Sequence, residues 1–280
     1  MKVAILAGGK GSRLAEETSI RPKPMVEIGG KPILWHIMKH YSAYGFNEFV
    51  IALGYKGEYI KKYFADFCRL SGDMKVDLEN GTIETNGHER MNWKVQLVDT
   101  GMETQTGARI KKLAPYIGNE AFMLTWGDGV SDVNLHELLR FHRNHGKIAT
   151  MTAVRPPARY GHLDMHGDKI VKFTEKSQLH EGWINGAFFV LEPEIFNYLD
   201  DNEKTIWERA PLENLAKDGQ LMAYRHKGFW QCMDTLREKH ILEELWNSDN
   251  CPWKSWEKKA PVPVKQNVFT RFRPKVEVTK

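Results

Sequence analysis

The sequence predicts an α/β protein in which helices flank a mostly parallel mixed sheet. Two observations support this prediction, the alternation of apolar patterns and the length and composition of the chain. Apolar runs of strand length alternate with segments whose apolar residues recur at helical spacing, as they do in strand–helix–strand units. The chain has 280 residues, of which 41% are hydrophobic and 27% charged. It is therefore long enough for one large domain or two small ones, and its composition is that of an ordinary globular protein.

The elements are justified by apolar spacing and by the residues at their ends. The first is a buried strand over residues 2–7, which stops at Gly8 and Gly9. A helix over 32–44 has one apolar face, with Pro32 near its start and Gly45 beyond its end,. Further helices are predicted over residues 57–70, 107–116, 134–144, 193–200, 205–217 and 235–246. Further strands are predicted over residues 49–53, 94–99, 121–126, 148–154, 183–191 and 221–226, with a hairpin over 161–165 and 169–174.

Composition and cysteine usage exclude several classes of protein. The three cysteines, Cys68, Cys232 and Cys251, form no Cys-x-x-Cys pair, so neither a disulfide framework nor a thiolate zinc site is expected,. No apolar run approaches the ~20 residues of a membrane-spanning helix, and we recognise no cleavable signal. Residues 252–280 carry a net charge of +6 within a total of +4, so the rest is nearly neutral. We expect a cytoplasmic protein with no nucleic-acid or membrane partner.

A glycine-rich turn follows the first strand. Gly8, Gly9 and Gly11 let backbone N–H groups approach an anion without obstruction by a Cβ atom, so a polyphosphate is the expected ligand,. The spacing fits neither a P-loop nor a dinucleotide-binding turn. Arg13 adds a cation, and Lys23 stands between two prolines that stiffen its backbone, which suits stabilisation of a phosphoryl group,. The glycines alone are also compatible with an ordinary strand-to-helix turn.

These residues resemble the signature of a known family. The segments Leu6-Ala-Gly-Gly-x-Gly-Ser-Arg-Leu14 and Lys23-Pro-Met-Val26 are similar to those of the sugar-1-phosphate nucleotidyltransferases, with Ser12 where threonine is usual. Runs of sequence at 16–18, 35–38, 97–101, 127–130 and 228–235 narrow the resemblance to the glucose-1-phosphate cytidylyltransferase branch. The resemblance covers about residues 1–257.

The resemblance implies a Rossmann-like nucleotidyltransferase fold with a smaller sugar-binding lobe. It implies transfer of a cytidylyl group from CTP to α-D-glucose 1-phosphate, which gives CDP-glucose and pyrophosphate. CDP-glucose suits the synthesis of deoxysugars for a surface polysaccharide such as a lipopolysaccharide O-antigen. The implied catalytic residues are Arg13 and Lys23. The implied nucleotide-binding residues are Leu6, Ala7, Gly8, Gly9, Gly11, Ser12, Arg13, Lys23, Thr104, Gly107, Arg109 and Gly127. Arg109 is equally compatible with a solvated helix position.

Two separated aspartates are candidate ligands for Mg2+. The joining of two phosphorylated substrates requires their charges to be screened, which a hard cation held by carboxylates does well. Asp128 follows a strand at the carboxyl edge of the predicted sheet, where open α/β sheets bind ligands,. Asp234 follows an apolar and aromatic run. The resemblance assigns Mg2+ to these two positions. The structural alternatives are a turn residue for Asp128 and a helix N-cap for Asp234.

The expected sugar pocket rests on polar groups where a core would prefer none. Glu175 and Lys176 follow one predicted strand, and Asn185 and Gly186 interrupt another,. In similar enzymes the Glu and Asn positions bind sugar hydroxyls and the Lys position binds the sugar phosphate, and Trp126 stands where it can form a wall. A surface pair and a bulge are the structural alternatives. The family's usual proline after Glu-Lys is Ser177 here, and a usual glycine is Ala187.

We expect one nucleotidyltransferase domain over residues 1–257, with a nucleotide half over about 1–154 and a sugar-binding lobe over about 155–235. Residues 258–280 form a basic, proline-containing arm that is either flexible or used in assembly,. The resemblance implies a homo-oligomer, either a trimer or a hexamer. The same chemistry with UTP or dTTP, and a non-catalytic nucleotide-sensing relative, are alternatives. A glycosyltransferase is disfavoured because no Asp-x-Asp triplet occurs.

Overall fold

Seven strands form the central sheet of the computed structural model, which describes all residues except 71, 87–89, 157–161, 175–181 and 258–280. The strands are, in spatial order, β14 (Leu221–Arg225), β10 (Ala149–Val154), β13 (Ile184–Leu191), β8 (Phe122–Trp126), β1 (Val3–Leu6), β4 (Glu48–Leu53) and β7 (Lys94–Asp99). Only β13 runs antiparallel to its neighbours; the other pairs are parallel. The predicted mostly parallel mixed sheet is confirmed.

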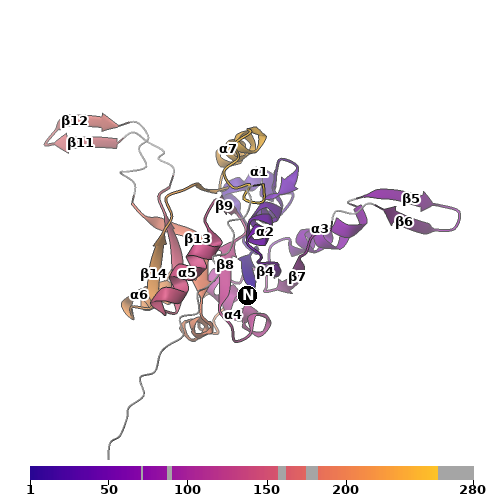
Figure 1. Cartoon of the computed structure of the whole chain (residues 1–280), viewed down its shortest axis with the longest axis horizontal. Helices are drawn as coiled ribbons and strands as arrows, with labels where there is room; N and C mark the ends of the chain where they lie inside the picture. The colour runs from indigo at the N-terminus through magenta and orange to yellow at the C-terminus, as the bar shows by residue number, and fades with distance from the viewer. Residues whose placement is uncertain (71, 87–89, 157–161, 175–181, 258–280) are drawn as a thin grey trace, which may run out of the picture.

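Helices cover both faces of this sheet (Figure 1). One face packs on α2 (Ile33–Ala43), α3 (Gly57–Leu70), α5 (Leu135–His145) and α7 (Leu236–Asn247). The other packs on α4 (Thr106–Ile117), the 3-10 helix η4 (Pro193–Tyr198) and α6 (Ala210–Lys217). Strand β1 shows why: Val3 and Ile5 belong to the first core cluster and Ala4 and Leu6 to the second, because successive side chains of a strand point to opposite faces,.

Short elements connect β1 to α2 and later carry the site. After the glycine turn come η1 (Ser12–Leu14), α1 (Ala15–Thr18), η2 (Lys23–Met25) and the paired strands β2 (Glu27–Ile28) and β3 (Lys31–Pro32). Far along the chain, β9 (Gly129–Ser131) pairs antiparallel with β15 (Trp230–Cys232). This two-stranded ribbon lies outside the main sheet and was not expected from the sequence.

Two hairpins project from opposite sides of the body (Figure 1). The hairpin of β11 (His162–His166) and β12 (Lys169–Thr174) confirms the predicted turn, with Gly167 in the left-handed region. The other, β5 (Asp73–Asp77) and β6 (Thr82–Asn86), was not predicted. In the part of the chain described, no helix has both the length and the apolar character needed to cross a membrane.

The helix predicted over 205–217 is only half helical. Helix α6 begins at Ala210, whereas the chain before it turns and offers its backbone to α4. The carbonyl of Glu203 accepts a hydrogen bond from Gln105 N, and that of Thr205 accepts one from Ala108 N. These carbonyls satisfy N–H groups at the start of α4 that have no partner within the helix. Similarly, the helix predicted over 193–200 is the 3-10 helix η4.

Two buried histidines of α2 make the stability of the fold depend on pH. Burial lowers the pKa of His36 and of His40 to about 4. Because the unfolded rings take up a proton near pH 6.5, the free energy of unfolding should be at its full value above that pH and fall as the pH drops toward 4. The expected loss is about 2 kcal/mol per ring at pH 5.

Urea denaturation at pH 7.5 and pH 5 measures this loss. His40→Gln, which removes one titrating ring, should show a smaller loss between the two pH values than the wild type. An equal loss in the two proteins would exclude His40 as a cause.

Candidate active site

A cavity of about 270 Å3 opens at the carboxyl ends of β1 and β8, the edge predicted to hold the ligand,. Its walls come from the glycine turn, η2, the start of α4 and the turn after β8. The lining residues are Leu6, Ala7, Gly8, Gly9, Gly11, Ser12, Arg13, Lys23, Pro24, Thr104, Gln105, Thr106, Arg109, Trp126, Gly127 and Asp128. The structure therefore brings together residues from four separate segments of the chain.

The glycine turn needs its glycines for distinct reasons. Gly11 has φ +62°, a left-handed conformation that favours glycine, at the start of η1,. A Cβ atom on Gly8 would lie only 2.4 Å from Nη1 of Arg109, so a side chain there would displace the guanidinium. Around Gly9 there is open space on the side where a Cβ would stand. The turn thus leaves room above its backbone, as a phosphate-binding turn requires.

Arg109 holds three loops of the cavity together. Its buried guanidinium lies between the ends of β1, β4 and β7 and donates hydrogen bonds to oxygen atoms of all three segments. The acceptors are Leu53 O (2.8 Å), Thr100 Oγ1 (2.6 Å), Gly101 O (2.7 Å), Gly8 O (3.0 Å) and Met102 O (3.2 Å). Burial lowers its pKa, against the opposing charges of Asp99 and Glu103. The alternative that Arg109 is a solvent-exposed helix residue is therefore wrong, because the side chain is buried. Contact between Arg109 and a nucleotide stays a prediction.

Lys23 lies at the centre of the charged part of the site. Its Nζ donates to Asp128 Oδ2 at 2.6 Å and to Asp234 Oδ1 at 2.5 Å. Burial of the ammonium group lowers its pKa, but the two carboxylates outweigh burial, so the net shift is upward and the group stays charged at neutral pH,. The flanking prolines place Lys23 in η2, with Pro22 in an extended conformation.

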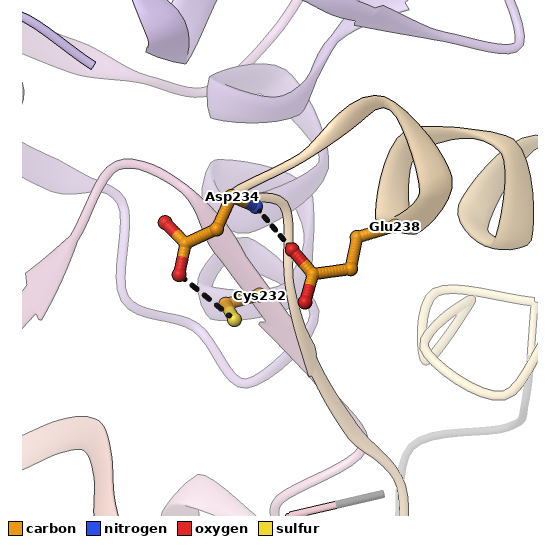
Figure 2. Close-up of side chains that lie close together, drawn as sticks. All are labelled: Cys232, Asp234 and Glu238. Atoms are coloured by element: carbon orange, nitrogen blue, oxygen red, sulfur yellow. Dashed lines mark hydrogen bonds between the residues drawn. The ribbon is translucent and has the colours of Figure 1, made fainter. Parts of the chain in front are cut away.

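Asp234 is held from several directions. Its Oδ1 also meets Nη2 of Arg13 at 3.0 Å, and the Cys232 thiol donates to its Oδ2 at 3.5 Å (Figure 2). Burial raises the pKa of Asp234. The hydrogen bond and charge of Lys23, together with the charge of Arg13, lower this pKa by more than burial raises it, so the net shift is downward and the carboxylate stays ionised. Burial, followed by the charge of Asp234, raises the pKa of Cys232 to about 12, so its sulfur remains a thiol.

The N-cap alternative for Asp234 is wrong. The cap of α7 is Thr235, whose side chain accepts from Glu238 N. The Glu238 carboxylate accepts from the backbone N–H groups of Asp234 (2.7 Å) and Thr235 (3.0 Å), as Figure 2 shows for Asp234. Glu238 therefore serves the helix, and the Asp234 side chain is left to face Lys23.

The β9–β15 ribbon sets the separation of the two aspartates. Asp128 precedes β9 and Asp234 follows β15 by two residues, and Gly129 pairs with Cys232. Met233 N donates to Asp128 O at 2.9 Å, which continues the pairing to the site. Two residues that are 106 positions apart in the sequence are thereby both held against the Nζ of Lys23.

The donor set fits a hard divalent cation. Mg2+ prefers carboxylate oxygens, and here two carboxylates already converge on a single cationic atom, the Lys23 Nζ,.

The residues predicted for the sugar are only partly assembled at the cavity. Trp126 lines it. The Asn185 side chain instead accepts a hydrogen bond from Ala187 N at 2.8 Å, and Trp230 Nε1 donates to Gly186 O at 2.8 Å. Glu175 and Lys176 lie outside the described residues. Contact of these residues with a sugar stays a prediction.

Ala187 adopts φ +62°, where the family's usual residue is glycine. The left-handed conformation costs a non-glycine residue about 1–2 kcal/mol, whereas glycine costs about 0.5–1 kcal/mol in lost freedom on folding. Ala187→Gly should therefore raise the free energy of unfolding by about 0.5–1 kcal/mol in a urea titration. Ala153→Gly, within β10, is the matched control and should lower it. Equal destabilisation by both changes would contradict the strain argument.

The start of α4 differs in detail from the sequence prediction. Thr104 lines the cavity, but Gly107 packs against the 205–207 segment, where a Cβ would lie 2.9 Å from Thr205 O. Gln105, Thr106 and Pro24 also line the cavity and were missed. A signal for them was available in the sequence: Gln105 and Thr106 follow Thr104, and Pro24 follows Lys23. Residues next to a predicted binding residue at the start of a helix often line the same cavity.

With this geometry in place, comparison with known proteins decides the family. Residues 2–236 match the nucleotidyl transferase family. The chain belongs to this family. A nucleotidyl transferase named glucose-1-phosphate cytidylyltransferase, from Salmonella typhimurium, is 50% identical over 259 residues, which cover 92% of this chain and all of the relative. A probable glucose-1-phosphate cytidylyltransferase of Bacillus subtilis is 44% identical over 91% of this chain and all of its own length. The resemblance to this branch of the nucleotidyl transferases is confirmed.

Solved structures confirm the nucleotidyl transferase fold. An apo UDP-glucose pyrophosphorylase matches with a TM-score of 0.63 and 18% identity, covering 88% of this chain and 97% of the other. HddC from Yersinia pseudotuberculosis matches with the same TM-score and 25% identity, covering 88% and 99%.

Proposed function

We propose that the protein transfers a cytidylyl group from CTP to α-D-glucose 1-phosphate, giving CDP-glucose and pyrophosphate. The observation that carries this proposal is Lys23, held against Asp128 and Asp234 beside the glycine turn in a chain half identical to named cytidylyltransferases. The cysteines fit a cytoplasmic enzyme, since Cys232 and Cys251 are both free thiols. Its product suits the synthesis of a surface polysaccharide.

In this mechanism the glycine turn and Arg13 hold the β- and γ-phosphates of CTP, and Lys23 contacts the α-phosphate. An oxygen of the sugar phosphate attacks the α-phosphorus in line. The new P–O bond forms as the bond to the β-phosphate breaks, and pyrophosphate leaves with the electron pair. Lys23 neutralises the charge that builds on the phosphoryl oxygens. No covalent intermediate on the protein is required.

Asp128 and Asp234 would hold Mg2+ as the cofactor of this reaction. When bound there, the ion supplies charge screening between the two phosphorylated substrates. The register of the β9–β15 ribbon presents both carboxylates, and Arg13 orients Asp234.

Pyrophosphate release tests the proposed function. CTP, UTP and dTTP are each offered with glucose 1-phosphate and with other sugar 1-phosphates, with Mg2+ or with EDTA. We expect release with CTP and glucose 1-phosphate, abolished by EDTA. A preference for UTP or dTTP would show that the nucleotide substrate is not CTP. Tight CTP binding without pyrophosphate release for any sugar phosphate would indicate that the protein is a non-catalytic nucleotide sensor and not an enzyme.

We also propose assembly as a homo-oligomer, a trimer or a hexamer. The two projecting hairpins support it, because each has one apolar face. In β5–β6, Met74, Val76 and Ile83 share a face and are exposed, while the ion pair of Lys75 and Glu84 lies on the other. In β11–β12, the exposed pair Leu163 and Phe173 lies on the face opposite that of Lys172. An isolated two-stranded hairpin is at best marginally stable in water, so a second copy of the chain is the expected cover.

Light scattering tests this assembly. Val76→Glu, on the apolar face of β5–β6, should yield smaller species than the wild type, whereas Thr82→Glu, on the polar face, should not. Light scattering of a protein that lacks residues 260–280 tests whether the arm contributes to assembly: smaller species than the wild type would show that it does. A monomeric wild-type protein at micromolar concentration would contradict assembly.

A further inference from the structure

We propose that Lys23 occupies the position of the metal ion until a nucleotide draws it away, so that the divalent cation site forms only when a nucleoside triphosphate is bound. This inference rests on the proposed function and assigns Lys23 a second task, that of a placeholder cation.

Geometry is the first support. The Nζ of Lys23 lies 2.6 Å from Asp128 Oδ2 and 2.5 Å from Asp234 Oδ1, in contact with the two carboxylates that would hold the metal ion. The Lys23 side chain is only 10% exposed, so little water competes with these contacts. While the ammonium group contacts both carboxylates it would exclude a divalent ion from them, because the two cations would compete for the same oxygen atoms and like charges repel.

Charge balance is the second support. Asp128 and Asp234 carry two negative charges, and Lys23 and Arg13, which contact them, carry two positive charges. An oxygen of Glu238 lies within 4.8 Å of an oxygen of Asp234, so the cluster carries one net negative charge and attracts a divalent ion less than the carboxylates would without the two cations. A triphosphate adds negative charge beside the same cations and changes that balance in favour of the ion.

The path of the lysine stem is the third support. A Cβ placed on Gly11 would lie 3.2 Å from the Cβ of Lys23 and 3.6 Å from its Cδ, so the stem runs against the turn that binds phosphates in the proposed mechanism. Pro22 and Pro24 fix the backbone on both sides,. Rotation of the side chain alone can therefore carry Nζ from the carboxylates to a phosphate, without movement of η2.

Mn2+ binding to the nucleotide-free protein tests the placeholder. Mn2+ takes the same oxygen ligands as Mg2+, and its electron paramagnetic resonance signal reports the free ion. Wild-type protein should bind Mn2+ weakly, and Lys23→Met should bind it about tenfold more tightly or better, a change of ~1.4 kcal/mol. Lys10→Met is the matched control: it removes a cation of the same turn that pairs with Glu103 instead, and should leave Mn2+ affinity unchanged. Adding Asp128→Asn to Lys23→Met should abolish the gain.

Thermal unfolding gives a second test. It uses only the wild-type protein, so it does not depend on whether a variant folds. CTP in the presence of EDTA should raise the melting temperature, whereas Mg2+ alone should not. Tight Mn2+ binding by the nucleotide-free wild type, equal Mn2+ affinity in wild type and Lys23→Met, or a rise in melting temperature with Mg2+ alone would overturn the inference. None of these measurements requires turnover, so they fail or succeed separately from the pyrophosphate assay.

Discussion

Replacement of Lys23 by methionine is expected to lower kcat for CDP-glucose formation by about 10²- to 10³-fold, as removal of a preorganised charge contact does in other active sites. The ammonium group is buried between two carboxylates and stays charged at neutral pH, so it is available to neutralise the phosphoryl oxygens as the reaction proceeds. Methionine keeps the length of the stem against Gly11. Steady-state pyrophosphate release measures kcat, and circular dichroism checks the fold.

Lys10→Met is again the control for this change. Lys10 lies in the same turn, but its Nζ pairs with the exposed Glu103 and touches neither aspartate. Its kcat should stay within a few-fold of wild type. A folded Lys23→Met protein with near-normal kcat would remove Lys23 from the mechanism.

Replacement of Arg109 by methionine is expected to destabilise the protein by about 3–5 kcal/mol, because it removes five hydrogen bonds from a charged donor,. Leu53 O and Gly8 O keep backbone N–H donors, from Thr100 and Tyr55, whereas the carbonyls of Gly101 and Met102 lose their Arg109 donor. The guanidinium contacts the ends of three neighbouring strands, including Gly8 of the phosphate turn. Without it the turn loses its support, so kcat/KM for CTP should also fall. Urea denaturation and initial rates measure the two effects.

Lys111→Met, on the same helix, is the control for Arg109. Among the described residues Lys111 makes one hydrogen bond, to Phe196 O at 2.8 Å, and its loss should cost about 1 kcal/mol or less,. If Arg109→Met were as stable as this control, the guanidinium would not hold the loops. If it were destabilised but bound CTP normally once folded, Arg109 would act on the fold alone.

Local patterns predicted the main sheet and most helices because the central strands, buried on both faces, form continuous apolar runs and the helices show apolar residues at helical spacing,. The hairpin β5–β6 was missed although its signal was present: Met74 and Val76 alternate with polar residues, and Asn80-Gly81 is a typical hairpin turn,. The β9–β15 ribbon has no comparable signal. Its strands have three residues each and pair over about a hundred positions, so only the assembled protein reveals it.

The candidate site shows the same division. The glycine turn, Lys23 and the two aspartates could be named from residue type and spacing, since phosphate and metal chemistry demands them. The role of Arg109 could not, because it depends on which loop carbonyls lie nearby after folding. The cap at Thr235 had a signal that was missed: Thr235 followed three residues later by Glu238 is the pattern of a capping box,.

The central claim is that a triphosphate lies over the glycine turn, between the cations Arg13 and Lys23 and an ion held by Asp128 and Asp234. A crystal structure with a non-hydrolysable CTP analogue and Mn2+ tests it most directly, because anomalous scattering locates the ion independently of the model of the ligand. We predict a Mn2+ peak within coordination distance of both aspartates, with Lys23 Nζ moved onto a phosphate oxygen. A triphosphate bound away from residues 8–13, or a peak that touches neither aspartate, would contradict the account.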